Sequence, residues 1–169
     1  MTTTHNHLTR RNLVASAAAL ALPSAVLAQA TPAINPVAKS ALVGPLAPNP
    51  VEFKKTVEQF IGRATPMTEG LQLDVSTLAD NPSAVPVKVK VTRPITEQDW
   101  CEEIIVLAEL NPSPLSCRLL FTAAAGTAEA AVRVRLSQSQ TIHALARMKS
   151  GQVLVAKQAV TVAASGCGM

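Results

Sequence analysis

Residues Val85-Pro86-Val87-Lys88-Val89-Lys90-Val91 carry the clearest structural pattern in the sequence. Valine stands at every second position, and proline or lysine stands between the valines. Successive side chains of a β-strand point to opposite faces of a sheet, so this alternation predicts one apolar face and one solvated face. Strands of this kind are typical of antiparallel sheets that bury one face against a core.

Similar runs lie on both sides of this strand. The other runs that predict strands are 71–75, 103–108, 115–121, 130–136, 140–148 and 152–163. Turn-forming residues separate them at Asn81-Pro82, Asn111-Pro112-Ser113-Pro114, Gly126 and Ser150-Gly151. About seven short strands in succession predict an all-β, immunoglobulin-like antiparallel sandwich.

A short helix is expected before the sandwich. Asn49 can cap its first turn, Pro50 suits the first helical position, and Glu52 stands three residues after the cap. Gly62 is a typical residue to end such a helix. The apolar stripe expected on this helix consists of Val51, Val57, Phe60 and Ile61.

The start of the chain is typical of an export signal. Arg10 and Arg11 precede an apolar, alanine-rich stretch from Leu13 to Leu22, and small residues follow. This stretch is shorter than the roughly 20 residues that cross a bilayer. Paired arginines ahead of a mildly apolar stretch are typical of a twin-arginine signal, and an ordinary secretory signal is the alternative. Both interpretations predict a periplasmic protein.

The composition supports one folded domain without a cofactor. Of the 169 residues, 48% are hydrophobic and 15% are charged, which is enough for a core and unlike a disordered chain. Basic residues are scattered and aromatic residues are scarce, so neither nucleic-acid binding nor a membrane span is expected. His143 is the one histidine outside the leader, which argues against a histidine metal site or a catalytic role.

The expected segments are the signal at 1–30, a proline-rich linker at 31–48, the helix at 49–62, the sandwich at 63–163 and a C-terminal arm at 164–169.

Three cysteines are an odd number for an exported protein, because oxidising compartments favour paired thiols. Cys101 and Cys117 flank the turn at 111–114 and form a candidate disulfide pair. Two free thiols that pack as small apolar groups are the alternative. In either case, Cys167 is the thiol expected to remain accessible.

Cys167 lies in the terminal run Ser165-Gly166-Cys167-Gly168-Met169. The last strand is expected to fade near Val162, and five extended residues reach at most roughly 17 Å, enough to enter a cleft on another protein. The glycines predict a thin, flexible arm. A catalytic thiol needs a rigid site and a neighbouring base, and this run offers neither. We therefore expect a thiol on which other proteins act.

Taken together, these features resemble the SoxY family, the carrier proteins of the bacterial thiosulfate-oxidising system. The resemblance covers the leader, the helix, GLQLDVSTLADNPSAVPVKVKV (70–91), PITEQDWCEEIIVLAELNPSP (94–114), VRVRLSQSQTIHALARMKSGQ (132–152) and the terminal cysteine. It implies that Cys167 holds the sulfur substrate covalently, on a flexible arm that includes Ser165, Gly166 and Gly168. It also implies a carrier acted on by enzymes, with no catalysis and no cofactor of its own.

The same resemblance implies a set of partners. A SoxZ-like sandwich protein would form a heterodimer with this chain. A SoxAX-like c-type cytochrome would attach thiosulfate oxidatively, and a SoxB-like hydrolase would release sulfate from the adduct. A SoxCD-like dehydrogenase would act on the sulfane sulfur that remains.

The chain departs from the family pattern in two places. Ser165 and Met169 stand where the family usually has glycine, and Cys101 and Cys117 are additional cysteines. Three alternatives therefore stay open: a variant carrier for another sulfur compound, a thiol-dependent transferase with Cys167 as nucleophile, and a structural or adhesive sandwich with an incidental thiol. A covalent dimer through an exposed Cys167 is a further alternative.

Overall fold

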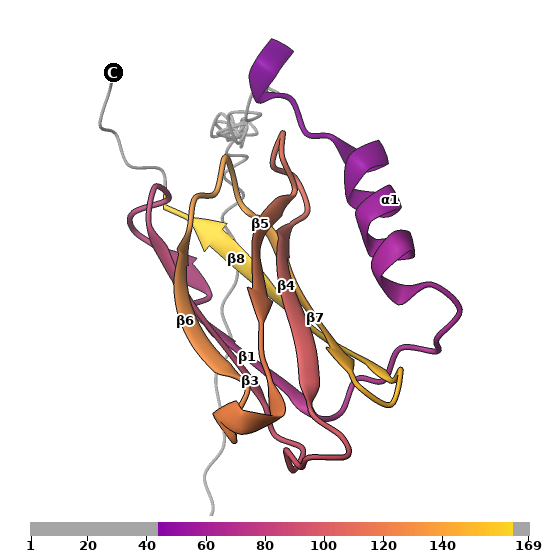
Figure 1. Ribbon diagram of the computed structural model, residues 1–169. Helices are drawn as coiled ribbons and strands as arrows, with labels where there is room; N and C mark the ends of the chain where they lie inside the picture. The colour runs from indigo at the N-terminus through magenta and orange to yellow at the C-terminus, as the bar shows by residue number, and fades with distance from the viewer. Residues whose placement is uncertain (1–43, 164–169) are drawn as a thin grey trace, which may run out of the picture. The chain divides into compact units, whose positions relative to one another are not determined.

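Two β-sheets packed face to face form the core of the computed structural model, which describes residues 44–163 (Figure 1). One sheet has the order β1-β3-β6 and the other has the order β2-β8-β7-β4-β5. The strands are β1 (Leu71–Val75), β2 (Leu78–Ala79), β3 (Val85–Val91), β4 (Cys101–Ala108), β5 (Leu115–Leu120), β6 (Glu129–Val134), β7 (Gln140–Met148) and β8 (Val153–Val162). Every pair of these strands is antiparallel except β2 with β8. The predicted fold class, an immunoglobulin-like sandwich after a short helix, is confirmed.

Strand β3 follows the predicted alternation and forms the centre of the three-stranded sheet. Its four valines are at most 4% exposed, whereas Pro86, Lys88 and Lys90 face solvent. Antiparallel pairing with β1 and β6 places further apolar side chains beside these valines on the inner face. The residues between the valines form the solvated face. The alternation in β3 therefore accounts for both faces at the centre of this sheet.

Strands β4 and β7 are buried on both faces, and in β4 the unbroken apolar run at 104–108 accounts for this burial. On the inner face, Ile104 and Val106 join the core between the two sheets. On the outer face, Ile105 and Leu107 join a second apolar cluster that includes Phe60. The five-stranded sheet is therefore the middle layer, with the three-stranded sheet on one side and helix α1 on the other (Figure 1).

Helix α1 (Pro50–Ile61) begins and ends at the predicted caps. The Glu52 N–H donates to Asn49 Oδ1 at 3.1 Å, and the Gly62 N–H donates to the Glu58 carbonyl at 2.8 Å. The expected apolar stripe was wrong at Val51, which is 76% exposed. Phe53 occupies the buried side instead, since it lies four residues before Val57 whereas Val51 projects from the opposite side of the helix.

Two short 3₁₀ segments complete the described chain. The first, η1 (Gly44–Leu46), lies within the segment expected to be a linker, and the second, η2 (Ala123–Ala125), precedes β6. The segments predicted as export signal and C-terminal arm lie outside the described residues. Neither α1 nor the 3₁₀ segments combine the length and the apolar character needed to cross a bilayer.

Candidate functional site

The described part of the chain stops just before the predicted carrier residues. Ser165, Gly166, Cys167 and Gly168 lie outside the described residues, so their role stays a prediction. The structure does describe the point from which they continue, at the end of β8. There the Val162 N–H donates to Ser139 Oγ at 2.9 Å, and the Ala163 N–H donates to the Ala79 carbonyl at 3.0 Å. The end of β8 is therefore hydrogen-bonded to two neighbouring segments of the sandwich.

The loops at this end of the sandwich are tied together by one amide side chain. Asn111 Nδ2 donates to the Arg135 carbonyl at 2.7 Å, and Asn111 Oδ1 accepts from the Ser137 N–H at 3.0 Å. Asn111 Oδ1 also accepts from Gln140 Nε2 at 2.8 Å. The Leu136 N–H donates to the Pro82 carbonyl at 2.8 Å, which joins the loop before β3 to the same group.

These loops form an open groove of about 520 Å³, which we call the loop groove. Its walls are residues 82–83, 111–113 and 135–137, with Leu46 at one side. Ser139 and Ala79, which hold the end of β8, lie two and three residues along the chain from these walls. Sequence reasoning missed the groove, because its walls come from three separate loops.

The candidate disulfide between Cys101 and Cys117 was wrong, because both are free thiols. Cys117 on β5 lies opposite Val106 on β4, whereas Cys101 lies five residues earlier on β4. Five strand residues span about 17 Å, and a disulfide requires Cα atoms within about 7 Å. The strand register therefore keeps the two sulfurs apart, and both side chains pack against the core as small apolar groups.

Both described thiols are poor nucleophiles. Burial raises the pKa of Cys101 to about 11, and the side chain is fully buried. Burial also raises the pKa of Cys117 above its ordinary value. Since the thiolate is the reactive form, neither group is suited to covalent chemistry at neutral pH.

His143 lies beneath α1 and is held by packing. Its ring meets Phe53 edge-on with centroids 4.9 Å apart, and Nε2 lies 3.3 Å from Glu109 Oε2. Burial lowers its pKa, against the opposing effect of the Glu109 carboxylate. These contacts account for the residue as part of the interface between helix and sheet.

A buried carboxylate near α1 was also missed by sequence reasoning. Glu103 is 7% exposed, and its Oε1 lies 2.5 Å from Arg118 Nη1, while its Oε2 lies 3.7 Å from Arg147 Nη1. Arg147 also donates to the Phe60 carbonyl at 2.5 Å and lies over the Phe60 ring. Glu103 and its two arginines join β4, β5 and β7 to the helix.

Within residues 44–163, no three His, Cys, Asp or Glu side chains are grouped so as to hold a metal ion.

A family model described as the sulfur oxidation protein SoxY matches residues 57–167 of this chain. The chain belongs to the SoxY family. The match begins in α1, includes every strand of the sandwich and reaches Cys167. The resemblance inferred from the sequence motifs is thereby confirmed.

Two solved structures illustrate how widely the fold of this SoxY-family chain is shared. The sulfur carrier protein SoxY from Chlorobium limicola f thiosulfatophilum is 18% identical with a TM-score of 0.54, over 68% of this chain and 98% of that one. A superoxide reductase (neelaredoxin) from Ignicoccus hospitalis is 15% identical with a TM-score of 0.50, over 56% and 81%. At such identities the likeness shows a common fold alone. A comparison with curated proteins gave no match.

Proposed function

We propose that this protein is a periplasmic carrier that holds thiosulfate-derived sulfur covalently on Cys167 and presents it to partner enzymes. The observation that carries the proposal is the SoxY family match, because it extends through the sandwich to Cys167. The twin-arginine pattern at Arg10 and Arg11 supports export. The carrier itself is not an enzyme in this proposal.

The described thiols support the choice of Cys167. Cys101 and Cys117 both have raised pKa values because they are buried, so each stays protonated and unreactive at neutral pH. Cys167 follows the end of β8 by only a few residues, and β8 is anchored through Val162 and Ala163. A thiol only a few residues beyond an anchored strand is suited to delivery into a narrow site on another protein.

The chemistry divides between this chain and its partners. A SoxAX-like c-type cytochrome removes two electrons as the Cys167 thiol and thiosulfate join, giving Cys167–S–S–SO₃⁻ and one proton. A SoxB-like hydrolase then adds water, releases sulfate and two protons, and leaves the persulfide anion on Cys167. A SoxCD-like dehydrogenase acts on the remaining sulfane sulfur. A SoxZ-like sandwich protein completes the carrier as a heterodimer.

A carrier for a different sulfur compound is the second candidate. Ser165 and Met169 favour it, because they stand where the family usually has glycine. Met169 adds bulk and an oxidisable sulfur next to the carrier position, which changes what a partner's channel must accept. Parallel loading trials with thiosulfate and with sulfide distinguish the two candidates.

Replacement of Cys167 by serine tests the proposal. The mature chain is incubated with thiosulfate, a SoxAX-like cytochrome and an electron acceptor, and its intact mass is recorded before and after reductant. We expect the native chain to gain the mass of one thiosulfate reversibly, and Cys167→Ser to gain none. Cys117→Ser is the matched control and should load normally. Loading of Cys167→Ser, or thiosulfate turnover by the purified chain alone, would contradict the carrier assignment.

A further inference from the structure

A second pocket lies between helix α1 and the edge strand β5, and we call it the helix pocket. Its volume is about 190 Å³, and Phe60 and Ile105 supply its apolar surface. The other walls are polar side chains from α1, β4, β5 and β7, namely Thr56, Gln59, Glu103, Arg118 and Arg147. The helix pocket therefore combines hydroxyl, amide and guanidinium donors with a single carboxylate.

The side chains of the helix pocket carry more positive than negative charge. Arg118 and Arg147 both pair with the Glu103 carboxylate, so two cations meet one anion. The other ion pairs of α1 are closed within the helix and leave this excess unchanged. They join Lys54 to Glu58 and Lys55 to Glu52. The excess positive charge at the pocket is therefore available to an incoming anion.

The two guanidinium groups keep N–H donors that the contacts of the fold do not use. A guanidinium group has donors on all three of its nitrogens. Within the described residues, Arg118 contacts Glu103 through Nη1. Arg147 contacts the Phe60 carbonyl through Nη2 and Glu103 through Nη1. The side chains of Arg118 and Arg147 are 54% and 35% exposed, so a ligand can reach the remaining donors.

Both arginines are held in position before any ligand arrives. Glu103 is 7% exposed and pairs with both of them, and the Arg147 guanidinium carbon lies 4.4 Å from the centroid of the Phe60 ring. Binding to groups that are already ordered costs less conformational entropy than binding to free side chains. The helix pocket is therefore a preorganised set of donors.

We propose that the helix pocket binds a small divalent oxyanion of sulfur, sulfate or thiosulfate, between Arg118 on β5 and the side chains of Thr56 and Gln59 on α1. Guanidinium groups bind such oxyanions through paired N–H donors, and hydroxyl and amide groups donate to the remaining oxygens. The choice of sulfur oxyanions rests on the proposed function, in which thiosulfate is consumed and sulfate is released around the carrier. The binding is non-covalent and does not involve Cys167.

A bound oxyanion links α1 to the edge of the sheet. The apolar cluster beneath α1 draws its strand residues from β4, β7 and β8. A ligand bonded to both Arg118 and the helix therefore adds a contact between α1 and β5. Because the pocket exists only in the folded chain, its occupancy stabilises the fold by mass action.

Equilibrium dialysis of the mature Cys167→Ser chain tests the proposal, with radiolabelled sulfate in one arm and radiolabelled thiosulfate in the other. The serine removes covalent loading, and sodium chloride keeps the ionic strength constant. Binding is measured directly, because sulfate also stabilises folded proteins in general through its exclusion from their surface. We expect saturable binding of one anion per chain in at least one arm, and the arm that binds identifies the ligand.

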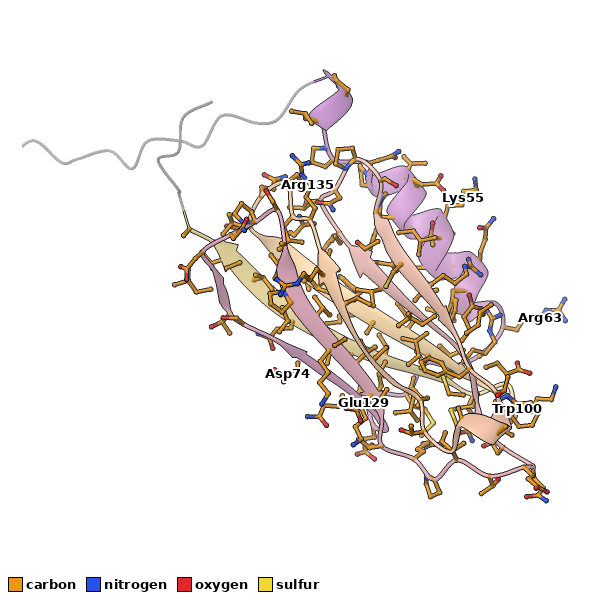
Figure 2. All side chains as sticks on the ribbon, turned by 60° about the vertical axis from the view of Figure 1, so that its left-hand side comes forward. Lys55, Arg63, Asp74, Trp100, Glu129 and Arg135 are labelled. Atoms are coloured by element: carbon orange, nitrogen blue, oxygen red, sulfur yellow. The ribbon has the colours of Figure 1, made fainter. Side chains whose placement is uncertain are left out.

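Gln59→Glu should raise the dissociation constant about tenfold, the effect of losing one charge-assisted hydrogen bond, because the new carboxylate offsets the excess positive charge. Gln72→Glu is the matched control, since it makes the same change of charge on an exposed residue of β1. Figure 2 shows Asp74, which shares the outer face of β1 with Gln72, on the opposite side of the sandwich from α1. The Gln72→Glu chain should bind the anion as tightly as the Cys167→Ser chain without a further substitution.

Arg118→Lys tests the guanidinium group itself. Lysine can keep the ion pair with Glu103, but its compact ammonium group lacks the second planar edge that guanidinium offers to an oxyanion. We expect the dissociation constant to rise about tenfold in this chain as well. Binding as tight as that of the unsubstituted pocket would show that Arg118 is not a ligand.

Failure of both anions to bind saturably would overturn the site, and so would equal dissociation constants for the Gln59→Glu and Gln72→Glu chains. Either result leaves the carrier function intact, because loading of Cys167 is measured separately by the mass of the native chain. A native chain that loads thiosulfate, together with a Cys167→Ser chain that binds neither anion, would contradict the oxyanion site alone.

Discussion

At the scale of single residues, Glu103 illustrates how tertiary neighbours determine the state of a charge. It is an acidic side chain on the outer face of β4, where five apolar residues follow it, and its two cationic partners come from β5 and β7. A buried carboxylate is costly unless it is paired and hydrogen-bonded. Arg147 meets this need and also contacts Phe60, so the ion pair and the helix contact share one side chain.

Gly70 is a residue whose replacement has a specific expected cost. Its φ is +98°, and a Cβ there would lie 2.8 Å from Arg93 Nε. Arg93, whose guanidinium group is hydrogen-bonded to Gln152, would have to shift to make room. We expect Gly70→Ala to lower the free energy of unfolding by about 1–3 kcal/mol, measured by urea denaturation.

Gly126→Ala is the control for Gly70→Ala. Gly126 has a φ of +67°, but a Cβ added there would meet no atom within 4 Å, so alanine brings backbone strain without a clash. The loss at Gly70 should therefore exceed the loss at Gly126. Equal losses would show that displacement of Arg93 contributes nothing.

At the scale of elements, the cap of α1 is a local feature with a measurable contribution. Asn49 Oδ1 accepts the Glu52 N–H at 3.1 Å, and both groups are exposed. We expect Asn49→Ala to lower the free energy of unfolding by about 1 kcal/mol, because one N–H of the first turn loses its side-chain acceptor. Asn49→Ser should retain most of the stability, since serine also accepts at this position. A serine variant as unstable as the alanine variant would contradict the cap.

Only the packed structure shows which face of α1 is buried. Phe53, Val57, Phe60 and Ile61 follow helical spacing and pack on the outer face of the five-stranded sheet. Val51 is apolar and close to them in sequence, yet it projects away from the sheet. Several rotations of a helix can bury apolar residues, and the sheet surface selects among them.

At the scale of the whole molecule, His143 couples the stability of the layered fold to pH. The imidazole is buried between β7 and α1, with Glu109 beside it and Lys157 opposite it on β8. Burial lowers its pKa in the folded state, so near pH 6 the unfolded chain binds more protons than the folded chain. The His143 contribution to stability is therefore present above its ordinary value of 6.5 and is lost as the pH falls through the folded pKa.

Thermal unfolding of the mature chain between pH 7 and pH 5 tests this coupling. We expect the unfolding temperature to fall with pH, and to fall less in His143→Gln, because glutamine does not titrate. The Glu129 carboxylate, whose pKa is lowered by hydrogen bonds from Lys88 and Lys90, loses its contribution only at a pH below its ordinary value of 4.5. Identical pH profiles for the two chains would exclude His143 as the source.

One part of the candidate site could be predicted from the local sequence, and the other part depends on the tertiary structure. The importance of Cys167 was predicted from a few neighbouring residues, because glycines and the absence of a base are local properties. The loop groove was not predicted, since Pro82, Asn111 and Arg135 lie on three loops that meet only in the folded sandwich. The sequence shows that Arg135 is charged, but it does not show that Arg135 forms no ion pair among the described residues.

The sequence by itself determined the strands, the capped helix and the membership of the SoxY family. Each depends on residues close together in the chain: a period of two for β3, cap residues at Asn49 and Gly62, and motifs of about twenty residues. Only the tertiary structure decided that Cys101 and Cys117 stay apart and that Glu103 meets two arginines. The physical reason is that strand order and register are set by burial of apolar faces across the whole chain, so no local pattern specifies which distant residues become neighbours.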